Sequence, residues 1–260
     1  MSGTDIRLVR GMKDEAWMLA NDNDVFGALI GKLTRLGKLE EDDRTAIRSL
    51  PTTIVEAVAN QFLVREGGNA GDCYLIIGGY VCRHKLASNG GRQIVSFHMA
   101  GDIVDLQHLL FATADHSIQT ITEVRYARFP AQALRLLAQE RPLIAEALWR
   151  DTLIDASIFR EWVLNVGRRD AKSRIAHMLC EFAVRREAAG LGSPERFDLP
   201  MSQEQIGDAT GLTSVHVNRM LRALAEDGVI DRDNRTIHIV DWDQMRRIAD
   251  FDPMYLHAAA

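Results

Sequence analysis

The segment of residues 201–225 constrains the fold of this chain most, because it has the pattern of two short helices joined by a glycine turn. Ser202 and Gln205 form a capping-box pair that predicts the start of the first helix. Gly211 interrupts the apolar pattern, and Thr213 is placed to cap a second helix. In this second helix, apolar residues recur every three or four positions and share one face. These residues are Val217, Met220, Leu221 and Leu224.

Polar side chains at the starts of both helices, and on the outer face of the second, are free to contact a partner. Arginine can donate to O6 and N7 of guanine together, and asparagine can pair with adenine or reach a phosphate. The segment therefore predicts a helix-turn-helix that enters the DNA major groove, with an ordinary helical hairpin facing water as the alternative. We expect Arg219 to contact guanine. The predicted DNA-binding residues are Ser202, Gln203, Thr213, Ser214, Val215, His216, Asn218, Arg219 and Arg222.

Two short β-rich runs follow Gly228 and flank the polar residues 232–235, which predicts a strand pair directly behind the second helix. This arrangement is a winged helix, and the segment resembles the C-terminal domain of the CRP/FNR family of bacterial transcription regulators, named after the cyclic-AMP receptor protein and the fumarate-nitrate regulator. Many family members have a glutamate at the position of Val215, so the resemblance implies a different DNA site here. The resemblance rests on Ser202, Gln203, Ile206, Gly207, Gly211, Leu212, Thr213, Val217, Arg219, Leu221, Leu224, Gly228, Val229 and Ile230.

Residues 53–130 consist of short β-rich runs separated by glycine turns. Such a series predicts a small barrel or roll. The turns and the closing Gly101-Asp102 pair are similar to the β-roll of the same family. The expected strands are residues 54–58, 61–64, 74–77, 80–85, 93–98, 117–122 and 124–129, preceded by helices at residues 24–36, capped by Asp24, and 41–50.

The roll departs from the family pattern at two positions. Family members that bind cyclic nucleotides hold the ribose with a glutamate and the cyclic phosphate with an arginine. Here Asp105 stands at the glutamate position and His116 at the arginine position. Because an imidazole lacks the bidentate fork of arginine, we expect no cyclic-AMP binding. Asp105, His116 and Ser117 are the candidate residues of an effector pocket whose ligand the sequence does not identify.

Residues 142–166 predict a long helix that starts at Pro142 and is apolar on more than one face. Such a helix is expected to be buried on more than one side. The resemblance implies that one side contacts the roll and the other contacts the same helix of a second subunit. Burial within a monomer is the alternative. The expected dimer interface consists of Ile144, Ala147, Leu148, Ile154, Ile158 and Trp162.

The chain has 31 Lys and Arg against 36 Asp and Glu, a formal net charge of −5, so bulk charge cannot supply DNA affinity. Local placement must supply it, and residues 212–222 hold two arginines, one histidine and no acid. A predicted helix at residues 170–186 adds an outward basic rim, which faces either DNA phosphates or water. The rim consists of Arg168, Arg169, Lys172, Arg174, Arg185 and Arg186.

The three cysteines, Cys73, Cys82 and Cys180, form no CxxC pair and have no zinc-site spacing, which indicates a reducing cytoplasm. We expect Cys180 to be a buried small hydrophobic residue. The histidines of the roll lack an HxH or HxxxH pattern, so we expect no metal site and no cofactor. No apolar run approaches the ~18 residues of a membrane span. Two alternatives stay open: a β-roll metalloenzyme with an accessory helical domain, and a regulator that senses haem or another small molecule.

The sequence therefore predicts an α+β chain of five parts. They are an N-terminal extension (1–23), a β-roll sensor-like domain (24–140), a dimerisation helix (141–166), a winged helix-turn-helix DNA-binding domain (167–251) and a tail (252–260). The predicted function is that of a homodimeric transcription regulator, not an enzyme, which reads palindromic double-stranded DNA in the cytoplasm. The resemblance also implies RNA polymerase as a partner.

Overall fold

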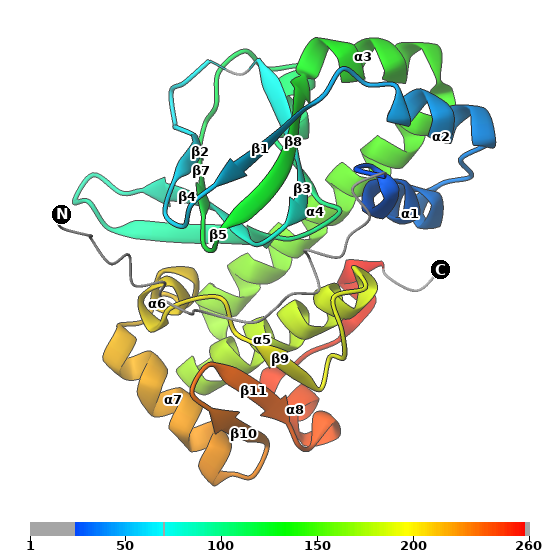
Figure 1. Ribbon diagram of the computed structural model, residues 1–260. Helices are drawn as coiled ribbons and strands as arrows, with labels where there is room; N and C mark the ends of the chain where they lie inside the picture. Colours follow the sequence, from blue (N-terminus) through cyan, green and yellow to red (C-terminus); the bar gives the residue numbers. More distant parts are fainter. Residues whose placement is uncertain (1–23, 70, 258–260) are drawn as a thin grey trace, which may run out of the picture.

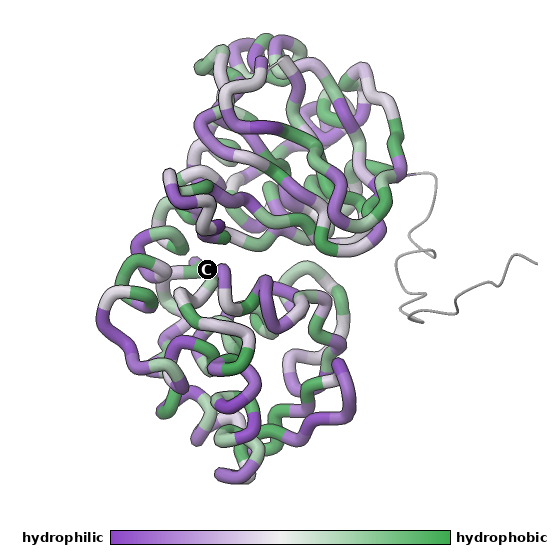
Figure 2. The backbone as a smooth tube through the Cα atoms, turned by 90° about the vertical axis from the view of Figure 1, so that its left-hand side faces the viewer, coloured by the Kyte–Doolittle hydropathy of each residue, from purple (hydrophilic) through white to green (hydrophobic). Residues whose placement is uncertain are grey.

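The computed structural model describes residues 24–69 and 71–257, so the expected N-terminal extension lies outside the described residues. The chain forms two lobes, and the long helix α4 (Pro142–Arg168) runs between them (Figure 1). One lobe contains most of the strands, and the other is mainly helical. Figure 2 shows the same division from a second direction. The predicted α+β fold is confirmed.

The N-terminal lobe is a β-roll of two four-stranded antiparallel sheets, with strand orders β1-β8-β3-β6 and β2-β7-β4-β5. Inward side chains such as Ile76, Val81 and Ile118 are fully buried between the sheets. Gly79 makes the turn from β3 to β4 with φ +83°, where a Cβ would lie 2.2 Å from the Glu123 carbonyl oxygen. The strands are β1 (Thr53–Ala57), β2 (Phe62–Val64), β3 (Asp72–Gly78), β4 (Val81–Leu86), β5 (Arg92–His98), β6 (Ile103–Val104), β7 (Ser117–Thr120) and β8 (Val124–Pro130). The roll was predicted, but the two-residue β6 was too short to recognise.

Helices α1 (Gly27–Leu36), α2 (Glu41–Arg48) and α3 (Ala131–Glu140) surround the outer side of the β3–β8 sheet. Their apolar residues share one buried cluster with β3, β8 and the first half of α4. Helix α3 was not predicted. Asp24 does not cap α1, because the N-cap is Phe26. The Asp24 carboxylate instead pairs with the Arg48 guanidinium at 3.0 Å, which links the start of α1 to the end of α2.

Helix α4 buries most of the residues that were expected to contact a second subunit. Ile144, Ala147 and Leu148 belong to the cluster of α1 and the roll. Ile158 and Trp162 belong to the core of the C-terminal lobe. None of these five residues is more than 6% exposed. The prediction that they form a dimer interface is therefore wrong, because their own chain already covers them.

A different face of α4 is apolar and uncovered. The exposed fractions are 70% for Trp149, 55% for Leu153, 51% for Phe159 and 56% for Val163. The sixth expected interface residue, Ile154, is partly buried against the core of the C-terminal lobe. The sequence indicated burial on two sides of the helix, and the structure shows which side its own chain leaves exposed.

The C-terminal lobe packs three short strands and several helices around one core. Helix α5 (Ala171–Ala188) is buried along most of its length and contacts α6, α7 and α8. The predicted strand pair is present as β10 (Ile230–Asp233) and β11 (Thr236–Ile239). Strand β9 (Arg196–Asp198) pairs with β11 and was not predicted. Helices α6 (Gln203–Thr210), α7 (Ser214–Glu226), α8 (Trp242–Ala249) and the 3-10 turn η3 (Pro253–Leu256) complete the lobe.

Candidate nucleic-acid interface

Local contacts that were predicted from the sequence fix the start of α6 and the turn between α6 and α7. The Ser202 hydroxyl accepts from the Gln205 N–H at 3.2 Å, and the Gln205 side chain accepts from the Ser202 N–H at 2.9 Å. Gly211 ends α6 in the left-handed region, with φ 69°. A Cβ at Gly207 would lie 2.4 Å from the Leu212 carbonyl oxygen, so only glycine allows this close approach. The two helices are thereby set in a helix-turn-helix arrangement.

Helix α7 is fixed to the lobe by its apolar face. The Thr213 hydroxyl caps the helix by accepting from the His216 N–H at 3.3 Å. Val217, Leu221 and Leu224 are at most 1% exposed and belong to the lobe's core. Because these side chains point inward, the opposite face of α7 must face solvent. Figure 1 shows α7 at the lower edge of the C-terminal lobe, away from the roll.

The outward face of α7 carries Arg219, which was predicted to contact guanine, and Val215. Val215 is 79% exposed, and Arg219 is also exposed. The Arg219 guanidinium donates to His216 Nε2 at 2.9 Å. The Asn218 amide donates to the Gln203 side chain at 3.4 Å and links α7 to α6. Arg219 is therefore positioned by an imidazole of its own helix rather than by a carboxylate.

None of the nine predicted DNA-binding residues is buried. Three of them, Gln203, His216 and Asn218, are partly exposed. Fully exposed are Ser202, Thr213, Ser214, Val215, Arg219 and Arg222. The structure thus leaves the whole set available to a ligand, at the starts of α6 and α7 and along the outer side of α7.

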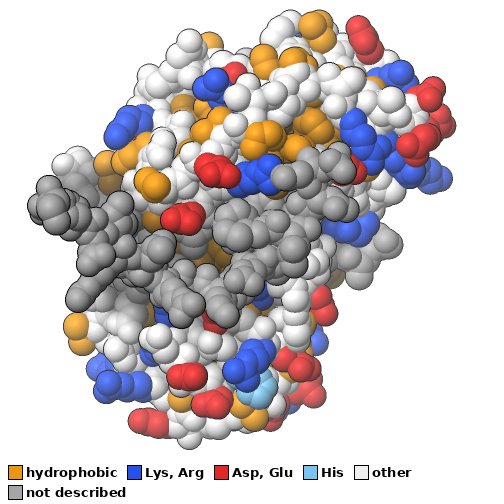
Figure 3. All heavy atoms as spheres, viewed as in Figure 1, with side chains coloured by type: hydrophobic (Ala, Val, Ile, Leu, Met, Phe, Trp, Pro, Cys, Tyr) orange, Lys and Arg blue, Asp and Glu red, His pale blue; other side chains and the backbone are white. Residues whose placement is uncertain are grey.

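Charges of both signs are spread over the molecular face in Figure 3, without one large basic patch. Part of the expected basic rim does not face solvent, whereas Arg168 is exposed and Lys172 and Arg174 are partly exposed. Arg169 and Arg186 are at most 9% exposed, and Arg169 pairs with Glu161 at 2.6 Å. Arg185 pairs with Asp102 of the roll at 3.2 Å. Arg186 instead donates to the Tyr80 hydroxyl at 3.0 Å and to the Leu191 carbonyl oxygen at 2.7 Å. The prediction that these three arginines point outward is wrong, because acids hold Arg169 and Arg185, and a hydroxyl and a carbonyl oxygen hold Arg186, against the protein.

The structure brings together the residues expected to form an effector pocket in the roll, but they bind each other. His116 Nε2 lies 2.7 Å from an Asp105 oxygen, and His116 Nδ1 lies 2.7 Å from an Asp115 oxygen. Both ring nitrogens of His116 are thus already in contact with carboxylates of the same chain. The Ser117 hydroxyl accepts from the Glu66 N–H at 3.0 Å. An anion in this place would therefore have to compete with Asp105 and Asp115 for the His116 ring.

Sequence reasoning missed Asp115 as the second partner of His116, although its place directly before the histidine was a signal. Asp105 is fully buried in the left-handed region, with φ 69°. One of its oxygens has no hydrogen bond and lies 3.7 Å from His108 Nε2. The roll thus contains, beside its apolar core, a polar cluster built around one buried carboxylate.

No group of three or more His, Cys, Asp or Glu side chains in residues 24–69 and 71–257 could hold a metal ion. The thiols of Cys73, Cys82 and Cys180 are free and buried. Burial raises the pKa of the Cys180 thiol to about 12, so this side chain packs as a small hydrophobic group. Within the described part of the chain, no helix is both long and apolar enough to cross a bilayer.

Known proteins resemble this chain in both lobes. Two family models match: the Crp-like helix-turn-helix domain at residues 173–248 and the cyclic nucleotide-binding domain at residues 54–141. A probable transcriptional activator of Rhizobium leguminosarum bv. viciae is 30% identical over 223 residues, which are 85% of this chain and 89% of the relative. The nitrogen fixation regulation protein FixK of Rhizobium meliloti (strain 1021) is 32% identical over 181 residues, 68% of this chain and 78% of the relative.

The solved structure of FixK2 from Bradyrhizobium japonicum has a TM-score of 0.71 and 26% identity, and the match covers 76% of this chain and 98% of that chain. The named relatives are transcription regulators and not enzymes, so the alternative of a β-roll metalloenzyme is set aside.

Proposed function

This chain belongs to the CRP/FNR family of transcription regulators, and we propose that it acts as a homodimer that binds a palindromic site on double-stranded DNA. The proposal rests chiefly on one observation: the outer face of α7 is polar, exposed and fixed in place by a helix-turn-helix. In the proposed complex, α7 enters the major groove, and Arg219 bonds O6 and N7 of a guanine. Such a regulator works in the cytoplasm beside RNA polymerase.

The uncovered face of α4 supports the proposal of a dimer. Trp149, Leu153, Phe159 and Val163 lie four to six positions apart along one helix, and each is more than half exposed. Apolar side chains grouped in this way on a helix are typical of a surface that another protein covers. A second copy of α4, related by a two-fold axis, would cover the same residues on both chains.

A two-fold dimer presents two copies of α7, and its DNA site should mirror that symmetry. We therefore expect half-sites about one helical turn apart, ~10 bp centre to centre. Repeated selection of the purified full chain on a pool of random duplexes tests this directly. An inverted repeat among the selected duplexes is the expected result. A single unrepeated half-site would refute the dimer, and a pool without enrichment would refute specific recognition by this chain.

The role of Arg219 can be separated from general attraction to DNA. Arg219→Ala should weaken binding to the selected site by roughly 1–3 kcal/mol and relax the preference at one base pair. Arg247→Ala is the matched control, because Arg247 is an exposed arginine of α8, on the other side of the wing. If Arg219→Ala weakened binding to selected and random DNA equally, Arg219 would contact only phosphate.

A further inference from the structure

A cavity of about 520 Å³ lies where the two lobes meet, outside both the DNA-binding face and the polar cluster of the roll. Its walls come from α1, the turn after β5, the middle of α4, the end of α5 and the turn η3. Asp105, His116 and Ser117 do not line it. Cavities of this size hold small organic molecules in other proteins. Anything bound here would contact the roll and the DNA-binding lobe at once.

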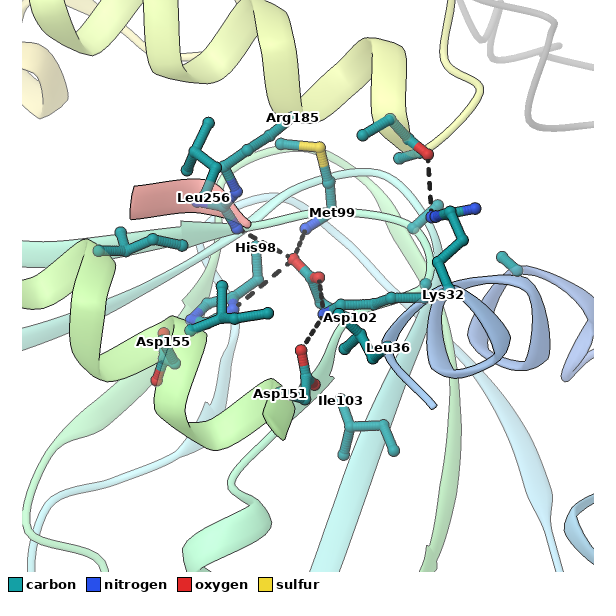
Figure 4. A pocket seen from close by; sticks show the side chains of 18 of the residues that line it. Lys32, Leu36, His98, Met99, Asp102, Ile103, Asp151, Asp155, Arg185 and Leu256 are labelled. Atoms are coloured by element: carbon teal, nitrogen blue, oxygen red, sulfur yellow. Dashed lines mark hydrogen bonds and ion pairs between the residues drawn. The ribbon is translucent and has the colours of Figure 1, made fainter. Parts of the chain in front are cut away.

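The floor of the cavity is an ion cluster joining four elements (Figure 4). The Lys32 ammonium of α1 lies 2.8 Å from a carboxylate oxygen of Asp102, in the turn after β5, and 2.8 Å from one of Asp151, in α4. Arg185 of α5 adds a contact to Asp102 at 3.2 Å. Burial alone would lower the pKa of Lys32, but the two aspartates raise it overall, so the ammonium stays charged. Burial lowers the pKa of the neighbouring His98 to about 3, so this ring is neutral.

The charges around the cavity balance. Its lining includes four Lys and Arg and four Asp and Glu side chains. Asp102 and Asp151 are paired with Lys32, and Asp155 is paired with Arg83 at 2.9 Å. A ligand that carried a net charge would lose its hydration and find no uncompensated partner on this floor, or would have to break an existing pair. The paired charges of the floor therefore select against a charged group placed there.

The rest of the wall is largely apolar. Leu36, Ile103, Ile154, Val184 and Leu256 line it from five different elements. Some hydrogen-bonding capacity remains on the floor, because the Lys32 ammonium has three N–H groups and contacts two carboxylates. A molecule with an apolar body and one polar end would match both parts of the wall.

We propose that this cavity is a binding site for an uncharged, mostly apolar small molecule whose single polar end faces Lys32 and Asp151. Because the ligand would contact both lobes, its affinity depends on how they are arranged, and binding would favour the arrangement described here. The cavity shares no residue with the proposed DNA-binding face, so its occupancy can be measured without DNA.

Gly31 of α1 offers a way to fill the cavity. It lines the cavity, and a Cβ placed there meets only the Arg35 side chain, at 3.9 Å. Glycine is unfavourable inside a helix, so Gly31→Trp should fill the space without weakening α1. Gly167→Trp is the matched control, because Gly167 is an exposed helical glycine of α4 with open space around it, outside the cavity.

The probe is Nile red, an uncharged dye that fluoresces in apolar surroundings, titrated onto the full chain. The wild-type chain and Gly167→Trp should bind it saturably at one site per chain, and Gly31→Trp should bind it at least about tenfold more weakly. Equal binding by all three proteins would overturn the proposal, since the dye would then lie on an exposed surface. Absence of binding to the wild-type chain would overturn it too.

Charge selection is tested with the anionic dye 8-anilinonaphthalene-1-sulfonate. We expect it to bind this site more weakly than Nile red does. Tighter binding of the anion that Gly31→Trp abolishes would overturn the assignment of an uncharged ligand. Thermal unfolding of each variant checks that it is folded, and Gly31→Leu, which fills less space, replaces Gly31→Trp if that chain does not fold.

Discussion

Phe159→Glu should dissociate the proposed dimer, because it places a charge at the centre of the uncovered face of α4. Phe159 is 51% exposed in the single chain. A phenylalanine has ~200 Å² of side-chain surface, so a dimer would cover ~100 Å² of it in each subunit. At ~25 cal/mol per Å² this covering contributes ~2.5 kcal/mol per subunit, and the substitution removes it twice, for ~5 kcal/mol. The dimer dissociation constant should therefore rise by at least ~1000-fold.

Sedimentation velocity over a range of protein concentrations measures this change directly. Phe111→Glu is the matched control, because Phe111 is 65% exposed and lies in the segment that connects β6 to β7, outside α4. It should leave the dimer intact. The reasoning is refuted if Phe159→Glu and the wild-type chain dissociate at the same concentration. It is also refuted if Phe111→Glu weakens the dimer as much, because the effect would then come from added charge rather than from this face.

Three further predictions follow from buried groups. The folded-state pKa of His98, about 3, lies below its ordinary value. Below about pH 6.5, His98 therefore binds a proton in the unfolded chain but not in the folded chain. Urea unfolding should therefore show a stability loss of ~1.4 kcal/mol per pH unit from this ring as pH falls toward about 4, and His98→Asn should remove that part of the slope. The Cys180 thiol should not react with a thiol reagent until the chain unfolds, and mass spectrometry of the labelled protein checks this; labelling of the folded chain would contradict its burial. Gly207→Ala should destabilise the C-terminal lobe by roughly 1–3 kcal/mol, because the new Cβ meets the Leu212 carbonyl oxygen, and thermal unfolding measures the loss.

The local parts of the fold were predictable because they depend on neighbours in the sequence. The capping box of Ser202 and Gln205, the turn at Gly211 and the cap at Thr213 all act within four residues, and the structure contains each of them. The roll was also recognisable, since its glycine turns punctuate short β-rich runs. Strand β9 escaped recognition because its three residues are held by pairing with β11, about forty residues later.

The positions and contacts of side chains that pack against distant segments could not be predicted in the same way. A helix apolar on two sides does not reveal which side its own chain will cover, so the dimer residues proposed on α4 were mostly the ones that pack inward. Arg169 and Arg185 were predicted to lie on an outward rim because some of the acids that hold them inside are about 80 residues away in the sequence. Arg185 forms an ion pair with Asp102, and Arg169 forms ion pairs with Glu161 and Asp250.

By itself, then, the amino-acid sequence determined the helix-turn-helix, the β-roll and the family, because these depend on periodicity, caps and turns that act over a few residues. Only the tertiary structure decided which face of α4 its own chain leaves exposed, which carboxylates His116 contacts inside the roll and where the cavity between the lobes lies. Each of these depends on groups 11 to 83 residues apart meeting in a space of low dielectric constant, where burial and charge pairing outweigh local preference.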